Sequence, residues 1–327
     1  MNIGQQMFLL AAKEKSFSRA AEKAFVTPQC LSDHIKRLEE QYQVVLFRRR
    51  PQLQLTDEGE ILLRYLQRIQ TLETSLNNEL ADSKSGVRGT VRLGIPSTRG
   101  ALTVPEVVVR FREYYPHVDM QTYFDDTRRL EELMLDDKLD VMLGVDAPQH
   151  VLFQRKPLTD EAIYLVVSEP TLRRHFGADW ERLAARFRAE GADLEQLAEI
   201  PFMQGSAYST STLAVQQYLL QRGIEVQMSL QTGNFDVQAE LCKSSDYAVL
   251  CPRFYVRRII ELNERGGSQL LVFSVRGFTK RLAVELITHR DARPLHYLSR
   301  FVGILEDVTR ENDRVVCAWL EAHGVGI

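Results

Sequence analysis

Hydrophobic residues near the N-terminus recur at helical spacing in two short runs that a tight turn separates. The second run predicts a buried stripe of Leu31, Ile35, Leu38 and Tyr42. Thr27 is a good N-cap for this helix, and Pro28 suits the first helical position, where its missing N–H costs nothing. Ala20 and Ala21 are small enough for the first helix to cross the second closely. The pattern therefore predicts a helix-turn-helix with its turn at residues 24–26.

An alternating segment follows the second helix and predicts a short strand-turn-strand. Leu53 and Leu55 alternate with glutamines, the period of a half-buried strand, and three arginines precede them. A helix-turn-helix followed by such a wing favours DNA binding, with the second helix in the major groove and the arginines at phosphates. The candidate DNA-contacting residues are Ser18, Arg19, Thr27, Gln29, Cys30, Ser32, Asp33, Lys36, Arg37, Arg48, Arg49 and Arg50.

A long amphipathic helix is predicted from residue 57 to residue 83, with Thr56 as its cap. Its apolar residues lie three and four positions apart and form a heptad seam wide enough for one partner helix. The seam consists of Leu62, Tyr65, Ile69, Leu72 and Leu76. We expect it to pair with the same helix of a second subunit, because a small neighbouring domain offers it no other obvious surface. Residues 83–89 are expected to form a hinge.

From residue 90 onward strands and helices alternate, which predicts an α/β fold with mainly parallel strands in two lobes. The chain is expected to cross to the second lobe after a strand at 163–168 and to return with a strand at 270–275. A helix at 294–309 completes lobe one, and 312–327 is expected to add a helix of unassigned role. The predicted units are a winged helix-turn-helix domain at 1–57, a linker helix and hinge at 58–89, and a two-lobed domain at 90–327, with lobe one at 90–166 and 270–327 and lobe two at 167–269.

Several short motifs occur at fixed spacing in the N-terminal region: Phe17-Ser18-Arg19-Ala20-Ala21-Glu22, Leu31-Ser32, Ile35, Leu38-Glu39, Leu46-Phe47, Leu55-Thr56 and Gly59. With these motifs the chain resembles the LysR-type transcriptional regulators over nearly its whole length. The resemblance implies a winged helix-turn-helix, a dimerising linker helix and a C-terminal effector-binding domain shaped like a type 2 periplasmic binding protein. The chain departs from the family at Pro28-Gln29-Cys30, where Gln-Pro-Ala is usual, and at Asp33, where a basic or amide residue is usual.

The resemblance also implies the partners of the chain. They are a double-stranded DNA operator, further copies of the chain in a homodimer and a dimer of dimers, RNA polymerase, and a small-molecule effector of unknown identity. No cofactor, metal or enzymatic activity is expected. A solute-binding protein would need a signal peptide and has no use for a winged helix. An enzyme on the same fold would need a poised acid–base pair, for which Asp125 and Asp236 are the only candidates.

Loops at the carboxyl ends of the predicted strands provide the candidate effector site, since ligands of such sheets bind there. The predicted lining is Ser97, Thr98, Arg99, Asp125, Gly205, Ser206, Tyr208, Asn234 and Phe235. The resemblance assigns effector contact to the loops that hold Ser97, Thr98, Gly205 and Ser206. Each hydroxyl could equally be a helix cap. The set suggests a small carboxylate or other polar metabolite, although Asp125 and Asp236 could instead select a cationic group.

Charge is distributed unevenly along the chain, whose net charge is −3. Residues 1–57 hold nine basic and six acidic side chains, a net charge of +3, so the remainder carries −6. A basic N-terminal region on an acidic body fits DNA binding at one end. The apolar run at residues 7–12 is too short to span a bilayer and has no positive segment before it, so a cytoplasmic location is expected.

The four cysteines, at positions 30, 242, 251 and 317, form no metal-ligand pattern. Peroxide-sensing members of the LysR family use a reactive cysteine pair, so Cys242 and Cys251 define a redox-sensing alternative. Lys243 and Arg253 are the only nearby basic residues in the sequence that would favour a thiolate. Reduced thiols without a redox role are the expected state.

Overall fold

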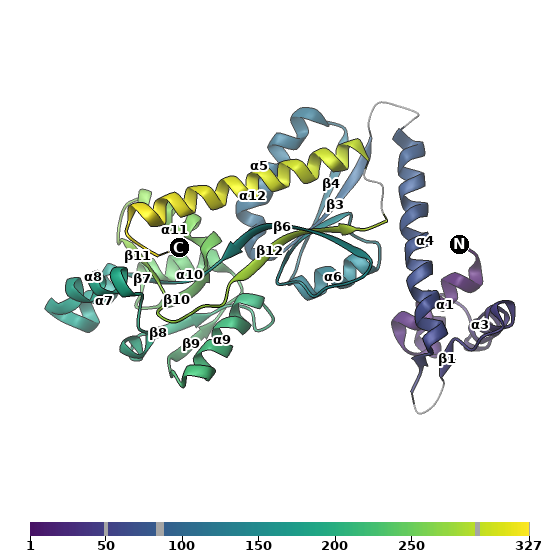
Figure 1. The fold of residues 1–327 in the computed structure, drawn as a ribbon, viewed down its shortest axis with the longest axis horizontal. Coiled ribbons are helices and arrows are strands. Elements are labelled where there is room, and N and C mark those ends of the chain that lie inside the picture. Colours follow the sequence, from purple (N-terminus) through teal and green to yellow (C-terminus); the bar gives the residue numbers. More distant parts are fainter. Residues whose placement is uncertain (49–51, 83–87, 292–294, 327) are drawn as a thin grey trace.

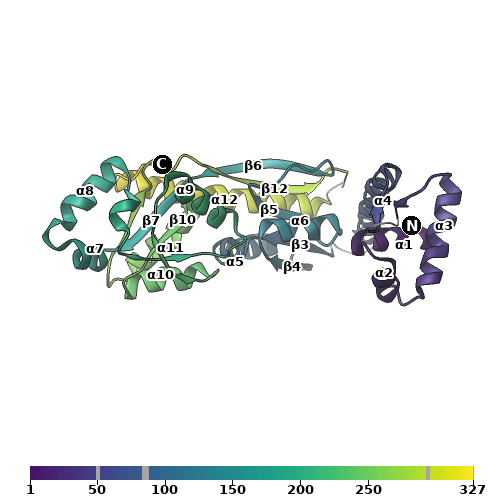
Figure 2. The ribbon, with the colours of Figure 1, turned by 90° about the horizontal axis from the view of Figure 1, so that it is seen from below.

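A computed structural model describes residues 1–48, 52–82, 88–291 and 295–326 of the 327-residue chain. A small N-terminal domain and the long helix α4 (Asp57–Asp82) lie at one end of an elongated α/β body (Figure 1). Figure 2 shows the same division from below, with α7 (Glu169–Phe176) and α8 (Trp180–Glu190) at the opposite end of the molecule.

The N-terminal domain has the predicted helix-turn-helix. Its helices are α1 (Ile3–Glu14), α2 (Phe17–Lys23) and α3 (Pro28–Tyr42). Thr27 caps α3 by accepting a hydrogen bond from the Cys30 amide at 3.2 Å. Leu31, Ile35 and Leu38 are buried as predicted, but Tyr42 is 43% exposed, because α3 ends there beyond the edge of the core.

The wing consists of two short antiparallel strands, β1 (Phe47–Arg48) and β2 (Gln54–Leu55). Glu39 on α3 holds the base of the wing in place, because the Glu39 carboxylate accepts a hydrogen bond from the Leu46 amide at 2.7 Å. Arg49 and Arg50, predicted at the tip of the wing, lie outside the described residues.

Thr56 caps α4 as predicted, because its hydroxyl accepts from the Gly59 amide at 3.0 Å. A Cβ atom at Gly59 would lie 2.3 Å from the Leu46 carbonyl oxygen, so only glycine lets the helix start this close to the wing. Leu66 is buried against the N-terminal core, which joins the first turns of α4 to that domain.

Two mixed five-stranded sheets form the body, one in each lobe. The first has the order β4-β3-β5-β12-β6, with strands Val118–Phe124, Gly89–Ile95, Val141–Val145, Leu282–His289 and Phe153–Glu161. The second has the order β11-β7-β10-β8-β9, with strands Leu270–Ser274, Ile163–Ser168, Ala248–Pro252, Pro201–Gln204 and Gln227–Gln231. The neighbours β3–β4, β3–β5, β8–β10 and β8–β9 are parallel, and the others are antiparallel.

The helices cover these sheets as an α/β fold requires. Lobe one contains α5 (Ser97–Tyr114) and α6 (Thr127–Leu135). Lobe two contains α7, α8, α9 (Thr210–Arg222), α10 (Phe235–Ser244) and α11 (Val256–Glu264), with short 3-10 turns at Gly177–Asp179, Leu194–Leu197 and Arg253–Tyr255. None of the helices in the described ranges combines the length and the apolar run that crossing a lipid bilayer requires.

The predicted lobe limits were wrong at two strands. Both β7 and β11 belong to the second sheet, where they pair with each other, so the crossings lie near residue 162 and between residues 275 and 281. Hydrophobic periodicity identifies a buried strand but not the sheet that receives it. The edge strand β6 was missed because polar residues and Pro157 interrupt its apolar pattern, which an edge position tolerates.

The C-terminal region is one continuous helix, α12 (His296–Ala322), rather than two. Its first half packs Tyr297 and Phe301 into the core of lobe one, and its second half packs Val316 and Leu320 into that of lobe two. Figure 1 shows this yellow helix running along both lobes. It therefore adds a packed connection to the two crossings between the sheets.

Candidate functional site

The outer face of α3 is polar and accessible. On α3, Gln29, Asp33, Lys36 and Arg37 are exposed, and Cys30 and Ser32 are half-buried. The other predicted contacts that the structure describes are also exposed: Thr27 at the cap of α3, Ser18 and Arg19 on α2, and Arg48 on β1. Gln29 donates from Nε2 to Asp33 Oδ1 at 3.0 Å, one helical turn along. The carboxylate of Asp33 therefore already accepts one hydrogen bond from its own helix.

The apolar seam on α4 splits into two parts. Leu62 is half-buried against the N-terminal core, so it belongs partly to that domain. From Tyr65 on, the seam is largely open to solvent: Tyr65, Ile69, Leu72 and Leu76 are 54%, 39%, 48% and 55% exposed. A row of apolar side chains of this kind on one helix face is typical of a protein–protein contact.

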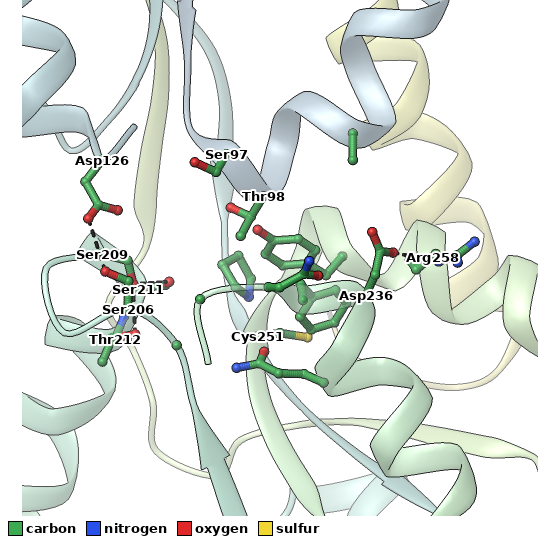
Figure 3. A pocket seen from close by; sticks show the side chains of 18 of the residues that line it. Ser97, Thr98, Asp126, Ser206, Ser209, Ser211, Thr212, Asp236, Cys251 and Arg258 are labelled. Carbon is green, nitrogen blue, oxygen red and sulfur yellow. Dashed lines mark hydrogen bonds and ion pairs between the residues drawn. The ribbon is translucent and has the colours of Figure 1, made fainter. Parts of the chain in front are cut away.

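A cavity of about 440 Å³ lies between the lobes. Helices from both lobes begin at its wall: α5 and α6 from lobe one and α9 and α10 from lobe two. Figure 3 shows Ser97 and Thr98 on one side, Asp126 with Ser206 at one end, and Asp236 with Arg258 at the other. Seven predicted residues line this cavity: Ser97, Thr98, Asp125, Gly205, Ser206, Asn234 and Phe235.

Two other predicted residues do not line it. Arg99 is 4% exposed and donates both terminal nitrogens to the Glu161 carboxylate, at 2.9 and 2.6 Å. Its guanidinium also lies over the Phe254 ring, so Arg99 joins the lobes instead of facing a ligand. Tyr208 is 81% exposed and is not part of the cavity lining; it lies on the turn that precedes the Ser209 cap of α9.

Hydrogen bonds close part of the gap between the lobes. Ser206 donates to Asp126 at 3.1 Å, and Thr210 donates to the Val145 carbonyl at 3.2 Å. Both bonds join lobe two to lobe one, so a ligand that competes for Ser206 or Asp126 would alter the contact between lobes.

Several lining residues were not foreseen from the sequence. They are Asp126, Ser209, Ser211, Thr212, Gln238, Tyr255 and Arg258, with smaller contributions from the glycine and apolar side chains around them. Asp126 and Ser209 lie within the predicted loops at 125–127 and 205–210 but were not selected there, and Ser211 directly follows the second loop. Gln238 and Arg258 lie inside helices, and no local pattern in the sequence marks them.

Cys242 and Cys251 are both fully buried in the core of lobe two. Burial raises the pKa of each thiol well above its usual range, because a thiolate there would be poorly solvated. A reactive cysteine needs the opposite environment. The geometry therefore does not favour the redox-sensing alternative.

Comparison with known families is decisive for the class of the protein. Residues 5–60 match the family described as bacterial regulatory helix-turn-helix protein, lysR family, and residues 84–310 match the LysR substrate binding domain. The chain belongs to the LysR family: it is a LysR-type transcriptional regulator with a helix-turn-helix DNA-binding domain and an effector-binding domain.

Individual relatives have compatible descriptions. A probable RuBisCO transcriptional regulator of Thalassiosira pseudonana is 28% identical over 72% of this chain and 73% of its own length. A protein of the same description from Phaeodactylum tricornutum is 33% identical over 48% of this chain, and the match spans about half of that relative, 52%.

Solved structures support the fold alone. ArgP from Mycobacterium tuberculosis aligns with a TM-score of 0.61 at 15% identity, over 94% of this chain and 96% of its own. Full-length OxyR from Pseudomonas aeruginosa aligns with a TM-score of 0.57 at 17% identity, over 94% and 96% of the two chains.

Proposed function

We propose that α3 enters the major groove of an operator and reads base edges with Gln29, Ser32 and Asp33. The observation that carries this proposal is the division of α3 into a buried apolar stripe and an accessible polar face. Lys36, Arg37 and the arginines of the wing contact phosphates, which position the domain without specifying sequence. Asp33 accepts from a cytosine amino group, the contact its chemistry favours.

The linker helices pair through the exposed part of the seam on α4. This pairing makes a homodimer and sets the distance between two recognition helices, so the operator has dyad symmetry. Two such dimers bind one regulatory region together, because a net charge of +3 in residues 1–57 gives modest phosphate attraction per subunit.

A small molecule binds between the lobes and controls the regulator. Ser97 and Thr98 contact it from lobe one, and Gly205 and Ser206 from lobe two, where Ser206 already bonds Asp126. An effector shifts the assembly only by binding one arrangement of lobes more tightly than the other. The shift changes how subunits sit on DNA and hence their contact with RNA polymerase. All of this takes place on the chromosome, in the cytoplasm.

Operator binding tests the DNA-contact proposal. Lys36→Ala should weaken binding to the DNA upstream of the protein's own gene several-fold, and the plot of log affinity against log salt should flatten by about 0.9 for each phosphate that the variant no longer neutralises. Fluorescence anisotropy over a salt series measures both quantities. Arg265→Ala is the matched control, since Arg265 is exposed on lobe two and far along the chain from the recognition helix. Equal affinity and slope in both variants would contradict the docking.

Paired serine variants test the effector site. Ser97→Ala and Ser206→Ala should abolish the response of a reporter gene to inducing growth conditions while leaving operator affinity unchanged. Ser229→Ala, an exposed serine on β9, should behave as wild type. Loss of operator binding together with the response would show that Ser97 and Ser206 have a structural role only.

A further inference from the structure

The cavity between the lobes has an excess of negative charge, which bears on the chemical class of the effector. Asp125, Asp126 and Asp236 line it, against the single guanidinium of Arg258, a net formal charge of −2. Arg258 is already engaged: Nε lies 2.8 Å from Asp236, an ion pair without hydrogen-bond alignment, and Nη1 donates to Glu261 at 3.2 Å. Among the described residues, neither Asp125 nor Asp126 has an ion-pair partner within 4 Å.

Two further side chains of the lining are largely buried but keep an oxygen atom without a hydrogen-bond partner among the described residues. Gln238 is 4% exposed, and its Nε2 donates to the Thr232 carbonyl at 2.8 Å. Its Oε1 accepts no hydrogen bond from the part of the chain that the structure describes. Tyr255 is 6% exposed and stacks on Phe235 with ring centroids 3.9 Å apart, yet its hydroxyl likewise has no hydrogen-bond partner in the described ranges. Both side chains line the cavity, so these two oxygens are available to a ligand there.

The lining groups that can form further hydrogen bonds are mainly acceptors. Gln238 offers a carbonyl oxygen, Asp125 and Asp126 offer carboxylates, and the Tyr255 hydroxyl can accept as well as donate. A ligand complementary to them must donate hydrogen bonds and carry positive charge. The paired rings of Phe235 and Tyr255 add an aromatic wall, which also favours a cation.

Helix N-termini are the features that oppose this conclusion, since they attract anions. Those of α9 and α10 are occupied by their own caps, because Ser209 accepts from the Thr212 amide and Asn234 from the Val237 amide, both at 3.2 Å. Two helices at the cavity, α5 and α6, begin without a side-chain cap. Each helix terminus is equivalent to roughly half an elementary charge, so these two together remain smaller than the net charge of −2 on the lining.

We propose that the effector of this regulator is a small organic cation, a primary amine, whose ammonium group is held by Asp125 and Asp126 and whose chain lies against Gln238, Phe235 and Tyr255. The proposal rests on the proposed function, because it specifies what the interlobe cavity binds. It also gives Ser206 a role: the ammonium replaces the serine hydroxyl as the donor to Asp126 and so changes the contact between lobes.

Three five-carbon probes that differ only in their end groups test the charge preference. They are 1,5-diaminopentane, glutarate and 1,5-pentanediol, added at millimolar concentration to the full-length protein. Thermal unfolding and isothermal calorimetry should show stabilisation and binding by the diamine, weaker effects of the diol and none of glutarate. The double variant Asp125→Asn/Asp126→Asn should bind the diamine at least about tenfold more weakly, the equivalent of removing one short-range charge pair at a protein surface.

Asp119→Asn is the matched control, since Asp119 is exposed on β4 outside the cavity and should leave diamine binding unchanged. A preference for glutarate, no binding of the diamine, or equal binding by the double variant and the control overturns the proposal. Operator affinity is measured on the same samples. If glutarate is preferred and operator binding persists, the proposed function stands and only the charge class fails, whereas absence of operator binding refutes the proposed function itself.

Discussion

Glu131 shows how one side chain can tie the stability of lobe one to pH. It lies on α6 at 9% exposure, and burial raises the pKa of its carboxyl to about 7, with Arg155 opposing the shift. The folded state thus holds this proton more tightly than the unfolded state, whose carboxyl has a pKa near 4.5. The contribution of Glu131 to the free energy of unfolding is therefore greatest below pH 4.5. It decreases as the pH rises from 4.5 to about 7.

Glu131→Gln should stabilise the protein at pH 8 relative to wild type by up to about 3 kcal/mol, because the glutamine side chain stays uncharged where the buried carboxylate would be ionised. Urea unfolding of both proteins at pH 5 and pH 8 measures the effect. Glu132→Gln is the control, because Glu132 is half-exposed and paired with Arg129 at the surface. An identical pH dependence in wild type and Glu131→Gln would contradict the assignment.

Individual site residues were predictable where a loop leaves a strand. Ser97, Gly205 and Asn234 line the cavity because the carboxyl ends of strands in the two sheets face each other there. Arg99 follows Ser97 closely and was predicted for the same reason. It turns instead to Glu161, a partner 62 positions away that no local pattern links to it.

At the scale of elements, α12 links the lobes more firmly than the sequence suggested. Beyond residue 310, where the family match ends, it still contributes Val316 and Leu320 to the core of lobe two. Arg253 adds to this joint, donating to Asp313 on α12 and to the Asp160 carbonyl of lobe one, both at 2.9 Å. The helical periodicity of α12 was visible, but its continuity and its second core contact depend on where lobe two lies.

Leu320→Ala should destabilise the protein by about 2–5 kcal/mol, the usual cost of removing a fully buried leucine side chain. Val315→Ala, on the same helix at 43% exposure, should change stability by less than about 0.5 kcal/mol. Chemical denaturation of the two variants makes the comparison. Equal, small effects would mean that the end of α12 does not pack on lobe two in solution.

The exposed seam on α4 makes a second prediction at this scale. Leu72→Glu/Leu76→Glu should produce monomers in sedimentation velocity at concentrations where wild type is dimeric, because charges would then face each other in the paired helices. Val151→Glu, which places the same charge at an exposed apolar position of the body, should remain dimeric. If the Leu72→Glu/Leu76→Glu variant is still dimeric, the dimer contact lies on a surface other than the seam of α4.

The whole molecule separates two features: the accessible polar residues of α3 lie in the N-terminal domain at one end, and a charged cavity lies between the two lobes of the body. Figure 1 shows the N-terminal domain set apart from that body. This division was predictable, since the helix-turn-helix pattern and the change to alternating strands and helices are both local. The exact positions of the crossings between the lobes were not predictable. The strands β7 and β11 pair although about a hundred residues separate them in the chain, and their apolar sequences do not indicate which sheet they join.

Footprinting of the operator tests the central claim most directly, namely that α3 enters DNA as half of a symmetric pair. With wild-type protein, hydroxyl-radical and methylation protection should reveal two equivalent major-groove segments whose centres lie about 10–10.5 base pairs, or a multiple of this, apart. Gln29→Ala should alter methylation protection in both segments alike. A single unsymmetrical footprint, or protection that the change at Gln29 leaves untouched, would contradict it.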